Sequence, residues 1–291
     1  MTNDEPWTIG RLLSWTTDFL RDKGADSPRL DAEVLLAHAL GCQRIELYTA
    51  FEEEPAEAVR SAFRELVRRR AEGTPVAYLV GYREFFSLSF QVTPDVLIPR
   101  PETEQLVVRA IDLSKTLAIS RIADVGTGSG ILAICCAKHI PESQVIALEI
   151  SPAALAIAAA NAEKHAVSDR IEFLQSDLLA NCAAEAHLDL IVSNPPYVST
   201  VEMAELDADV RNHEPHVALD GGANGTSVIE RLIPQAAERL RPGGWLLIEV
   251  SPHNAQRVEQ LVAAAEGMTL QDTIRDLASH PRVVQAQRDI S

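Results

Sequence analysis

The sequence predicts an α/β protein with a mostly parallel sheet of seven strands, preceded by a small helical bundle and a β-hairpin. Three observations predict this fold. From Arg121 onward, short apolar runs alternate with helical patterns, as in repeated strand–helix units. Before residue 75, apolar residues recur at spacings of three and four, as in amphipathic helices. A glycine-rich turn, Gly126–Gly130, separates a strand pattern from a helix pattern.

The first 74 residues are predicted to be helical throughout. Helices are expected over residues 9–20, 27–40 and 56–70. Gly41 and Gly73 follow the second and third helices, where a glycine commonly ends a helix. This part has no strand pattern and no cluster of catalytic residue types. We interpret residues 1–74 as a helical domain that docks the substrate.

Residues 75–98 differ from the preceding helices in composition and periodicity and are expected to form a linker hairpin. Two runs, 78–82 and 85–92, carry aromatic residues and period-two alternation, which is typical of a pair of strands. Pro99 and Pro101 then break the chain before a helix that begins near Glu102. Residues 99–291 are taken as the second domain.

Strands and helices alternate through the second domain. Strands are predicted over residues 121–125, 145–150, 171–175, 188–193, 245–250, 270–274 and 282–286, and helices over 131–139, 152–165, 227–240 and 255–265. Repeated units of this kind form a mostly parallel sheet with helices on both faces. Such sheets bind ligands at the carboxyl ends of their strands.

Length and composition are those of a globular protein. At 291 residues the chain is long for one domain, and it is 46% apolar and 23% charged. No apolar run approaches the roughly 18 residues of a membrane span, and the acidic start is unlike a secretory signal. Cys42, Cys135, Cys136 and Cys182 form no CxxC pair and are expected to be reduced packing residues. We therefore expect a cytoplasmic protein with no membrane partner.

The formal net charge of −16 at pH 7 argues against a nucleic-acid partner. Proteins gain affinity for a nucleic-acid backbone when Lys and Arg neutralise its phosphates. The one dense basic cluster, Arg64, Arg68, Arg69 and Arg70, follows several glutamates and is interpreted as the solvated face of a helix. The charge favours a protein or small-molecule substrate.

The most informative motif is Asn194-Pro195-Pro196-Tyr197, which ends the apolar run of residues 188–193. Two consecutive prolines cannot continue a sheet ladder, because neither has an N–H group and each has a fixed φ angle. The strand therefore stops and leaves the Asn194 side chain and the Pro195 carbonyl at its end. Two such acceptors suit a planar NH2 group, which belongs to an amide or to a nucleobase.

The glycine-rich turn predicts a nucleoside-binding site. Its glycines permit a tight turn and let a ligand approach bare backbone, while the following helix offers unsatisfied N–H groups. Glu149, at the end of the next strand, is placed to accept hydrogen bonds from ribose hydroxyls. A tight turn in an unrelated α/β protein is the alternative interpretation.

The spacing of the glycines in the turn limits the class of ligand that the turn is expected to bind. The third glycine comes one residue too early for a dinucleotide site, and no Gly-Lys-Ser/Thr follows for a nucleoside triphosphate. The segment Asp124–Gly130 resembles the first motif of S-adenosylmethionine-dependent methyltransferases, which implies S-adenosyl-L-methionine as the cofactor. In that family, the residue at the position of Asp177 lies beside the adenine amino group, and Leu178 would line the same pocket. A solvent-facing loop aspartate is the alternative for Asp177.

The two motifs in this order are similar to the Asn-Pro-Pro-Tyr methyltransferases, which methylate planar NH2 groups. Five further segments are more specific: Asp31–Leu36, Gly81–Phe85, Val96–Glu104, Glu214–Gly222 and Arg282–Val284. Together they resemble the bacterial peptide-chain release factor glutamine N5-methyltransferases over nearly the whole chain. The related ribosomal-protein glutamine methyltransferases would show Pro-Arg-Ser-Pro where this chain has Pro-Arg-Pro-Glu.

This resemblance implies a Rossmann-like methyltransferase fold that methylates the glutamine of the Gly-Gly-Gln motif in release factors, the expected protein partners. It implies catalytic roles for Asn194, Pro195 and Tyr197, with Pro196 joining them in substrate binding. The cofactor-binding residues it implies are Gly126, Thr127, Gly128, Ser129, Gly130, Glu149, Asp177, Leu178 and Asn194. A monomer is expected, and no metal site, because His213 and His216 lack a third ligand.

Several alternatives stay open at this point. An N6-adenine nucleic-acid methyltransferase uses the same acceptor motif, and a non-enzymatic cofactor-binding scaffold is a second rival. Arg100 either acts in the site or holds its loop through Glu102 or Glu104. Phe85 and Phe86 belong either to the pocket wall or to the core.

Two departures from the family pattern concern the cofactor. Glu149 replaces the usual aspartate, which keeps the carboxylate, and Leu178 stands where an aromatic residue is frequent.

Overall fold

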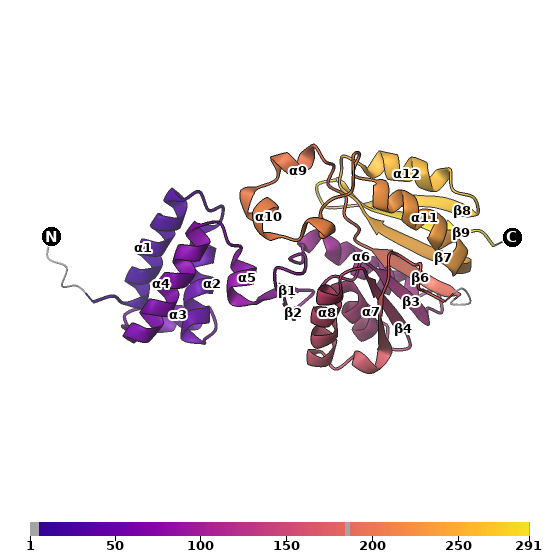
Figure 1. Cartoon of the computed structure of the whole chain (residues 1–291). Coiled ribbons are helices and arrows are strands. Elements are labelled where there is room, and N and C mark those ends of the chain that lie inside the picture. Colours follow the sequence, from indigo (N-terminus) through magenta and orange to yellow (C-terminus); the bar gives the residue numbers. More distant parts are fainter. Residues whose placement is uncertain (1–5, 184–186, 291) are drawn as a thin grey trace. The chain divides into compact units, whose positions relative to one another are not determined.

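The structure is a computed structural model that describes residues 6–183 and 187–290 (Figure 1). The chain divides into two compact units. The first holds the residues up to Tyr82 together with Ala208–His213, and the second holds Arg83–Asp207 and the residues from Glu214 onward. Within the described ranges, no helix is both long and apolar enough to cross a membrane.

The first unit is helical, as the sequence predicts. Its helices are α1 (Ile9–Asp22), α2 (Pro28–Leu40), α3 (Glu46–Thr49), α4 (Glu57–Ala71), α5 (Val76–Val80) and α10 (Ala208–His213). The apolar faces of α1, α2 and α4 meet in one core that includes Leu13, Leu36 and Phe63. The three long helices are thereby confirmed to within two residues at each end.

The strand predicted over residues 78–82 is wrong. Residues Val76–Val80 form the short helix α5, which Gly81 ends in a left-handed conformation at φ +79°. The run is too short for periodicity to separate a strand from a helix, and burial of Leu79 and Val80 in the helical core decides the outcome. The hairpin lies just beyond, as β1 (Tyr82–Phe85) and β2 (Leu88–Gln91).

Arg70 differs from the rest of the basic cluster. Its side chain is only 11% exposed and forms ion pairs with Asp31 at 2.8 Å and with Asp209 of α10 at 2.5 Å. Arg64 and Arg68 remain exposed, as predicted for a solvated face. Arg70 is therefore a structural residue that ties the 208–213 segment into the first unit.

The second unit carries the sheet. Its strands are β3 (Arg121–Val125), β4 (Gln144–Glu149), β5 (Ile171–Gln175), β6 (Leu188–Ser193), β7 (Leu240–Glu249), β8 (Met268–Arg275) and β9 (Pro281–Arg288). Its helices are α6 (Glu104–Ser114), α7 (Ile131–His139), α8 (Pro152–Lys164), α9 (Glu202–Glu205), α11 (Ser227–Arg239) and α12 (Ala255–Ala263), with 3-10 turns η1 (Pro101–Thr103), η2 (Ser168–Arg170) and η3 (His216–Ala218). The seven-stranded, mostly parallel sheet of the prediction is confirmed.

The strand order is β5-β4-β3-β6-β7-β9-β8, and β9 runs antiparallel to both β7 and β8. The chain moves outward from β3 through β4 to β5, and then returns to place β6 on the other side of β3. This reversal is the switch point at which open α/β sheets bind ligands. Val125 of β3 pairs with Ser193 of β6, so the glycine turn and Asn194 both begin immediately beyond paired residues.

Helices cover both faces of the sheet (Figure 1). Leu106 of α6, Ala133 of α7 and Ala162 of α8 belong to one buried cluster. Leu232 of α11 and Val258 of α12 belong to the other. The strands between these layers are buried on both sides, which explains why they read as apolar runs.

β7 begins at Leu240 rather than at the predicted Trp245. Leu188 pairs with Leu240 and Leu190 with Trp245, so the intervening residues form a bulge. Pro242 lies in this bulge, where a proline is tolerated because its missing N–H is not needed by the ladder. The start of this strand has no recognisable strand pattern, because it contains a proline and two glycines.

Asn161 of α8 joins the hairpin to the glycine turn. Its fully buried side chain accepts from the Gln91 N–H at 2.7 Å and donates to the carbonyls of Gln91 at 3.0 Å and Ser129 at 2.9 Å. One residue therefore satisfies three backbone groups, two at the end of β2 and one in the glycine turn.

Asn161→Ala is expected to lower the free energy of unfolding by about 2–4 kcal/mol, because it leaves buried backbone groups without partners. Urea denaturation measures the loss. Asn181→Ala is the matched control, since its exposed amide donates to a single backbone group among the described residues, the Gln175 carbonyl. Equal stability of the two variants would contradict the bridging role.

Candidate active site

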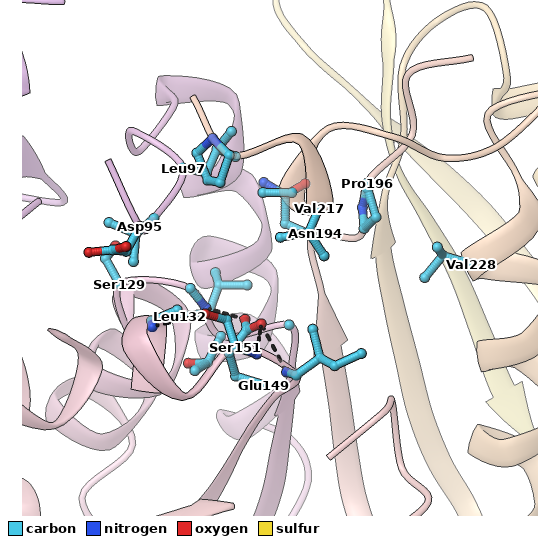
Figure 2. Close-up of a pocket in the computed structure, with 18 of the residues that line it drawn as sticks. Asp95, Leu97, Ser129, Leu132, Glu149, Ser151, Asn194, Pro196, Val217 and Val228 are labelled. Atoms are coloured by element: carbon cyan, nitrogen blue, oxygen red, sulfur yellow. Dashed lines mark hydrogen bonds between the residues drawn. The ribbon is translucent and has the colours of Figure 1, made fainter. Parts of the chain in front are cut away.

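A cavity of about 430 Å³ opens at the carboxyl ends of β3, β4 and β6. Its lining contains most of the residues that the sequence predicts for a site: Gly126, Thr127, Gly128, Ser129, Glu149, Asp177, Leu178, Asn194 and Pro196. Figure 2 shows Glu149 and Ser151 in one part of this pocket and Asn194, Pro196 and Val217 in another. The structure thus brings the glycine turn and the proline motif to one cavity.

The glycine turn lies between β3 and α7, and Gly126, Gly128 and Gly130 all have positive φ angles. A Cβ atom added to Gly126 or Gly128 would meet no atom within 4 Å, so bare backbone faces open space there. A Cβ atom on Gly130 would lie 3.2 Å from the Cβ of Ala158, so this glycine serves the packing of α7 on α8. Gly130 does not line the cavity, and the structure gives it a packing role.

Glu149 ends β4 and fixes the wall of the cavity. Its Oε1 accepts from the N–H groups of Ile150 at 2.9 Å and Ser151 at 3.0 Å, and its Oε2 accepts from Gly128 at 3.1 Å (Figure 2). A carboxylate has about four acceptor positions, so one remains for a ligand hydroxyl. Glutamate is one methylene longer than aspartate, and the extra length lets the carboxylate reach the Gly128 N–H of the glycine turn.

Asp124 supports the turn from below. Its buried Oδ2 accepts from the Thr127 hydroxyl at 2.6 Å and from the Ala133 N–H at 3.0 Å. Burial raises the pKa of Asp124 to about 7, although these two hydrogen bonds oppose the rise. Asp124 therefore holds the shape of the loop and does not line the cavity.

Asp177 and Leu178 line the cavity after β5. The Asp177 carboxylate is half-exposed and forms an ion pair with Arg231 at 2.6 Å. Leu178 has φ +53°, a left-handed conformation that is uncommon for such a side chain. Sequence analysis missed Arg231, which also lines the cavity from α11.

The proline motif begins where β6 ends. Asn194 lines the cavity and donates from Nδ2 to the Thr103 Oγ1 at 3.1 Å. Pro196 also lines the cavity, whereas Pro195 is buried behind it. Ser193 locks the strand end, because its hydroxyl donates to the Val125 carbonyl at 2.7 Å.

Tyr197 is not among the residues that line the cavity. Its hydroxyl lies 3.5 Å from Oε1 of Glu249, at the end of β7. Burial, and then the nearby Glu249 carboxyl, raise the pKa of Tyr197 above its usual value. The tyrosine therefore stays protonated at neutral pH and acts as a donor toward Glu249.

Arg100 pairs with Glu214, not with Glu102 or Glu104. The Arg100 guanidinium lies 2.5 Å from Oε1 of the buried Glu214, whose Oε2 accepts from the Ile98 N–H at 3.2 Å. This pair joins two segments, 95–100 and 214–220, that contribute residues to the lining of the cavity. Sequence analysis singled out both segments by resemblance but assigned them no contact, because nothing local indicates a pairing over so many residues.

The aromatic residues of the hairpin belong to the core. Phe85 is buried against Phe90, Phe86 packs on His139, and neither lines the cavity. His216 lines the cavity through η3, and His213 lies in α10. Among the residues that the structure describes, no group of three or more His, Cys, Asp or Glu side chains is placed to hold a metal.

Two family models match the chain: the PrmC N-terminal domain over residues 11–81 and the methyltransferase small domain over residues 103–208. A protein named release factor glutamine methyltransferase in Rhodopirellula baltica is 52% identical, and the match covers 99% of this chain and 98% of that protein. The chain belongs to the release factor glutamine methyltransferase family. Members in Moorella thermoacetica and Geobacter sulfurreducens are 42% and 41% identical and match 97% and 87% of this chain. These matches cover 99% and 88% of those two proteins.

Solved structures agree with the fold of this family. The catalytic domain of hMettl16, solved in complex with a MAT2A 3'UTR hairpin, has a TM-score of 0.55 at 16% identity and covers 78% of this chain and 82% of its own. A methyltransferase from Pyrococcus furiosus has a TM-score of 0.51 at 18% identity and covers 77% and 98%. At these identities the likeness establishes the Rossmann-like methyltransferase fold alone.

The residues of this family member fit S-adenosylmethionine. The cavity offers bare backbone at Gly126 and Gly128 for a close approach, and Glu149 retains acceptor capacity for hydroxyl groups. Leu132 and Ile131 supply apolar wall at the start of α7, whose N-terminus faces the turn. These donors, acceptors and apolar surfaces are those that a nucleoside with a charged side chain requires.

Glu249 gives the stability of the protein a pH dependence. Burial raises its pKa to about 7, with Glu102 adding to the rise, while Thr103, Arg282 and Tyr197 oppose it. Because the folded-state pKa exceeds the unfolded one, the folded state holds the proton more tightly. The contribution of Glu249 to the free energy of unfolding is therefore fully present below the pKa that Glu249 has in the unfolded state. It is lost as the pH rises toward 7.

Glu249→Gln is thus expected to gain stability relative to the unmodified protein as pH rises from about 4.5 to 7, by at most about 1.4 kcal/mol per pH unit. Denaturant unfolding at several pH values measures the difference. Glu238→Gln, at an exposed position, is the control. A difference that stayed constant with pH would contradict the raised pKa.

Proposed function

We propose that the chain transfers a methyl group from S-adenosylmethionine to the side-chain nitrogen of a glutamine in a peptide-chain release factor. The observation that supports this most directly is the placement of Asn194 and the glycine turn at one cavity beside the switch point of the sheet. Within that release factor, the Gly-Gly-Gln motif is the proposed target. The reaction is placed in the cytoplasm, where translation takes place.

Asn194 and Pro195 are proposed to hold the substrate amide. Bound S-adenosylmethionine supplies an electrophilic methyl group on a sulfonium. The new N–C bond forms as the S–C bond breaks, sulfur keeps the electron pair, and nitrogen then releases one proton to solvent. An amide nitrogen is a weak nucleophile, because its lone pair is delocalised into the carbonyl group. Two fixed acceptors, Asn194 Oδ1 and the Pro195 carbonyl, bind its N–H groups and stabilise the positive charge that develops there.

The other residues of the cavity are proposed to orient the reactants. Gly126, Gly128 and Glu149 hold the nucleoside end of the cofactor, and Asp177 and Leu178 border it. The Arg100–Glu214 pair holds together two segments that line the cavity. Near-attack placement of this kind contributes roughly 7–11 kcal/mol in well-oriented systems.

The helical first unit is proposed to dock the release factor outside the reacting motif. Its described residues carry no candidate catalytic cluster, and its exposed aromatic residues, Trp15 and Tyr48, offer contact surface. We also propose that the protein works as a monomer and binds no nucleic acid directly.

Mass spectrometry tests this function. Purified release factor is incubated with the protein and S-adenosylmethionine, and the peptide containing Gly-Gly-Gln is analysed for the mass of one added methyl group on glutamine. A release factor with that glutamine replaced by alanine is the control. Parallel incubations with DNA and RNA separate the N6-adenine alternative. Methylation of nucleic acid without methylation of release factor would overturn the proposal.

A further inference from the structure

Behind Asn194 lies a buried row of polar groups to which the reaction assigns no part. Thr103, at the end of η1, is fully buried and accepts a hydrogen bond from Asn194 Nδ2 at 3.1 Å. The Thr103 hydroxyl also acts on the side chain of Glu249, which is 2% exposed, as a hydrogen-bond donor that lowers its pKa. The three side chains come from the residue after β6, from η1 and from the end of β7, so the tertiary fold alone brings them together.

The direction of these hydrogen bonds follows from their chemistry. A hydrogen bond that lowers the pKa of a carboxyl is donated to it, so the single proton of Thr103 is directed toward Glu249. The hydroxyl oxygen is then left as an acceptor, and the group facing it from Asn194 must be the NH2. This places Oδ1 at the other end of the amide. Among the described residues, the Asn194 side chain makes no hydrogen bond besides the one to Thr103.

The environment of Glu249 leaves its carboxyl available as an acceptor for the Thr103 hydroxyl. Its Oε2 has no hydrogen-bond partner among the described residues, and Tyr197 approaches only Oε1. Glu102 and Arg282 are the other charged groups that act on it. When Glu249 carries a proton, one of its oxygens still accepts, so Thr103 retains a partner to which it donates.

We propose that Thr103 and Glu249 are positioning residues that fix the amide of Asn194 with its nitrogen inward and Oδ1 toward the substrate. This rests on the proposed function. An asparagine amide turned by half a rotation has nearly the same shape but presents NH2 to the substrate NH2. Two donors then face each other, and the substrate nitrogen loses an acceptor. The pair therefore selects an acceptor rather than a donor at the site of methyl transfer.

Thr103→Val tests this, because valine keeps the shape of threonine and removes both hydrogen-bonding functions. We expect kcat for release-factor methylation to fall about 10- to 100-fold, with a smaller change in KM for release factor and unchanged cofactor affinity by calorimetry. Thr103→Ser restores the hydroxyl and is expected to return kcat to within about threefold of the unmodified protein. Thr17→Val is the matched control, since the Thr17 hydroxyl is likewise buried and donates to the Leu13 carbonyl of its own helix.

A second readout distinguishes orientation from packing. A release factor whose target glutamine is replaced by glutamate carries acceptors where the substrate carries donors. The quantity compared is the inhibition constant of this glutamate release factor divided by KM for the glutamine release factor. This ratio is expected to be at least about 10-fold lower in Thr103→Val than in the unmodified protein, because an unrestrained Asn194 amide can present its NH2 group to the glutamate. Loss of packing alone would weaken both ligands and leave the ratio unchanged.

Glu249→Leu is the second variant. Its side chain is of similar size but accepts no hydrogen bond from Thr103, so kcat is expected to fall in the same direction. Full kcat in both variants, an unchanged inhibition ratio, or failure of Thr103→Ser to restore kcat would each overturn the proposal. Absence of methylation by the unmodified protein would instead overturn the proposed function.

Discussion

Asn194→Ala is expected to lower kcat for methylation of release factor by about 10²- to 10³-fold, the loss typical of removing one fixed polar group at a reacting centre. The variant lacks the side-chain oxygen that receives a substrate N–H, while the Pro195 carbonyl remains. The strand end should persist, because the Ser193 hydroxyl still binds the Val125 carbonyl. Steady-state methyl transfer with labelled S-adenosylmethionine measures the loss.

Calorimetric titration with S-adenosylmethionine is the accompanying measurement for Asn194→Ala. Affinity within a few-fold of the unmodified protein is expected, since Gly126, Gly128 and Glu149 are untouched. Gln144→Ala, which removes an exposed side-chain amide at the amino end of β4, is the activity control. Near-normal turnover by Asn194→Ala would remove the proposed clamp on the substrate amide.

Glu149→Gln is expected to weaken S-adenosylmethionine binding by about 10- to 100-fold, because hydrogen bonds to a charged acceptor contribute about 1.5–3 kcal/mol. The glutamine also brings an NH2 group to the place where the carboxylate accepts from the Gly128 N–H. Two donors would then face each other and disturb the glycine turn itself. The loss should appear in Kd and in KM for the cofactor, with kcat at saturation less affected.

Glu172→Gln is the matched control for Glu149→Gln, because it makes the same chemical change at an exposed position of β5. Its cofactor affinity should equal that of the unmodified protein. A Glu149→Gln protein that bound S-adenosylmethionine normally would show that the carboxylate serves the loop alone.

The parts of the fold that sequence analysis predicted well are those that local patterns determine. β3, α7 and β5 have the predicted bounds, since each is a clear apolar run or helical pattern between turn residues. The predictions for the segment that forms α5 and for the start of β7 were wrong, because burial against distant helices or strands determines the structure of these segments. The cofactor turn and the proline motif were found because each has unusual residues at fixed spacing.

The rest of the site depends on tertiary contacts that leave no local pattern. Glu214 lies more than a hundred residues from Arg100, and Thr103 is similarly remote from Glu249. Arg231 faces Asp177 only because α11 packs beside the loop after β5. Single residues of these common types carry no signal in one sequence. Their roles follow from geometry, and the roles assigned to the site residues remain predictions until the variants are measured.

The path of residues 208–213 limits how such proteins can recombine. This segment leaves the sheet-bearing part of the chain, pairs with Arg70 through Asp209, and returns to Glu214. A gene fusion that exchanged only the first 82 residues between two relatives would separate Arg70 from Asp209, one of its two aspartate partners. A chimera that keeps both ion pairs of Arg70 therefore needs three crossovers, so the helical part and this short insert are expected to be inherited together.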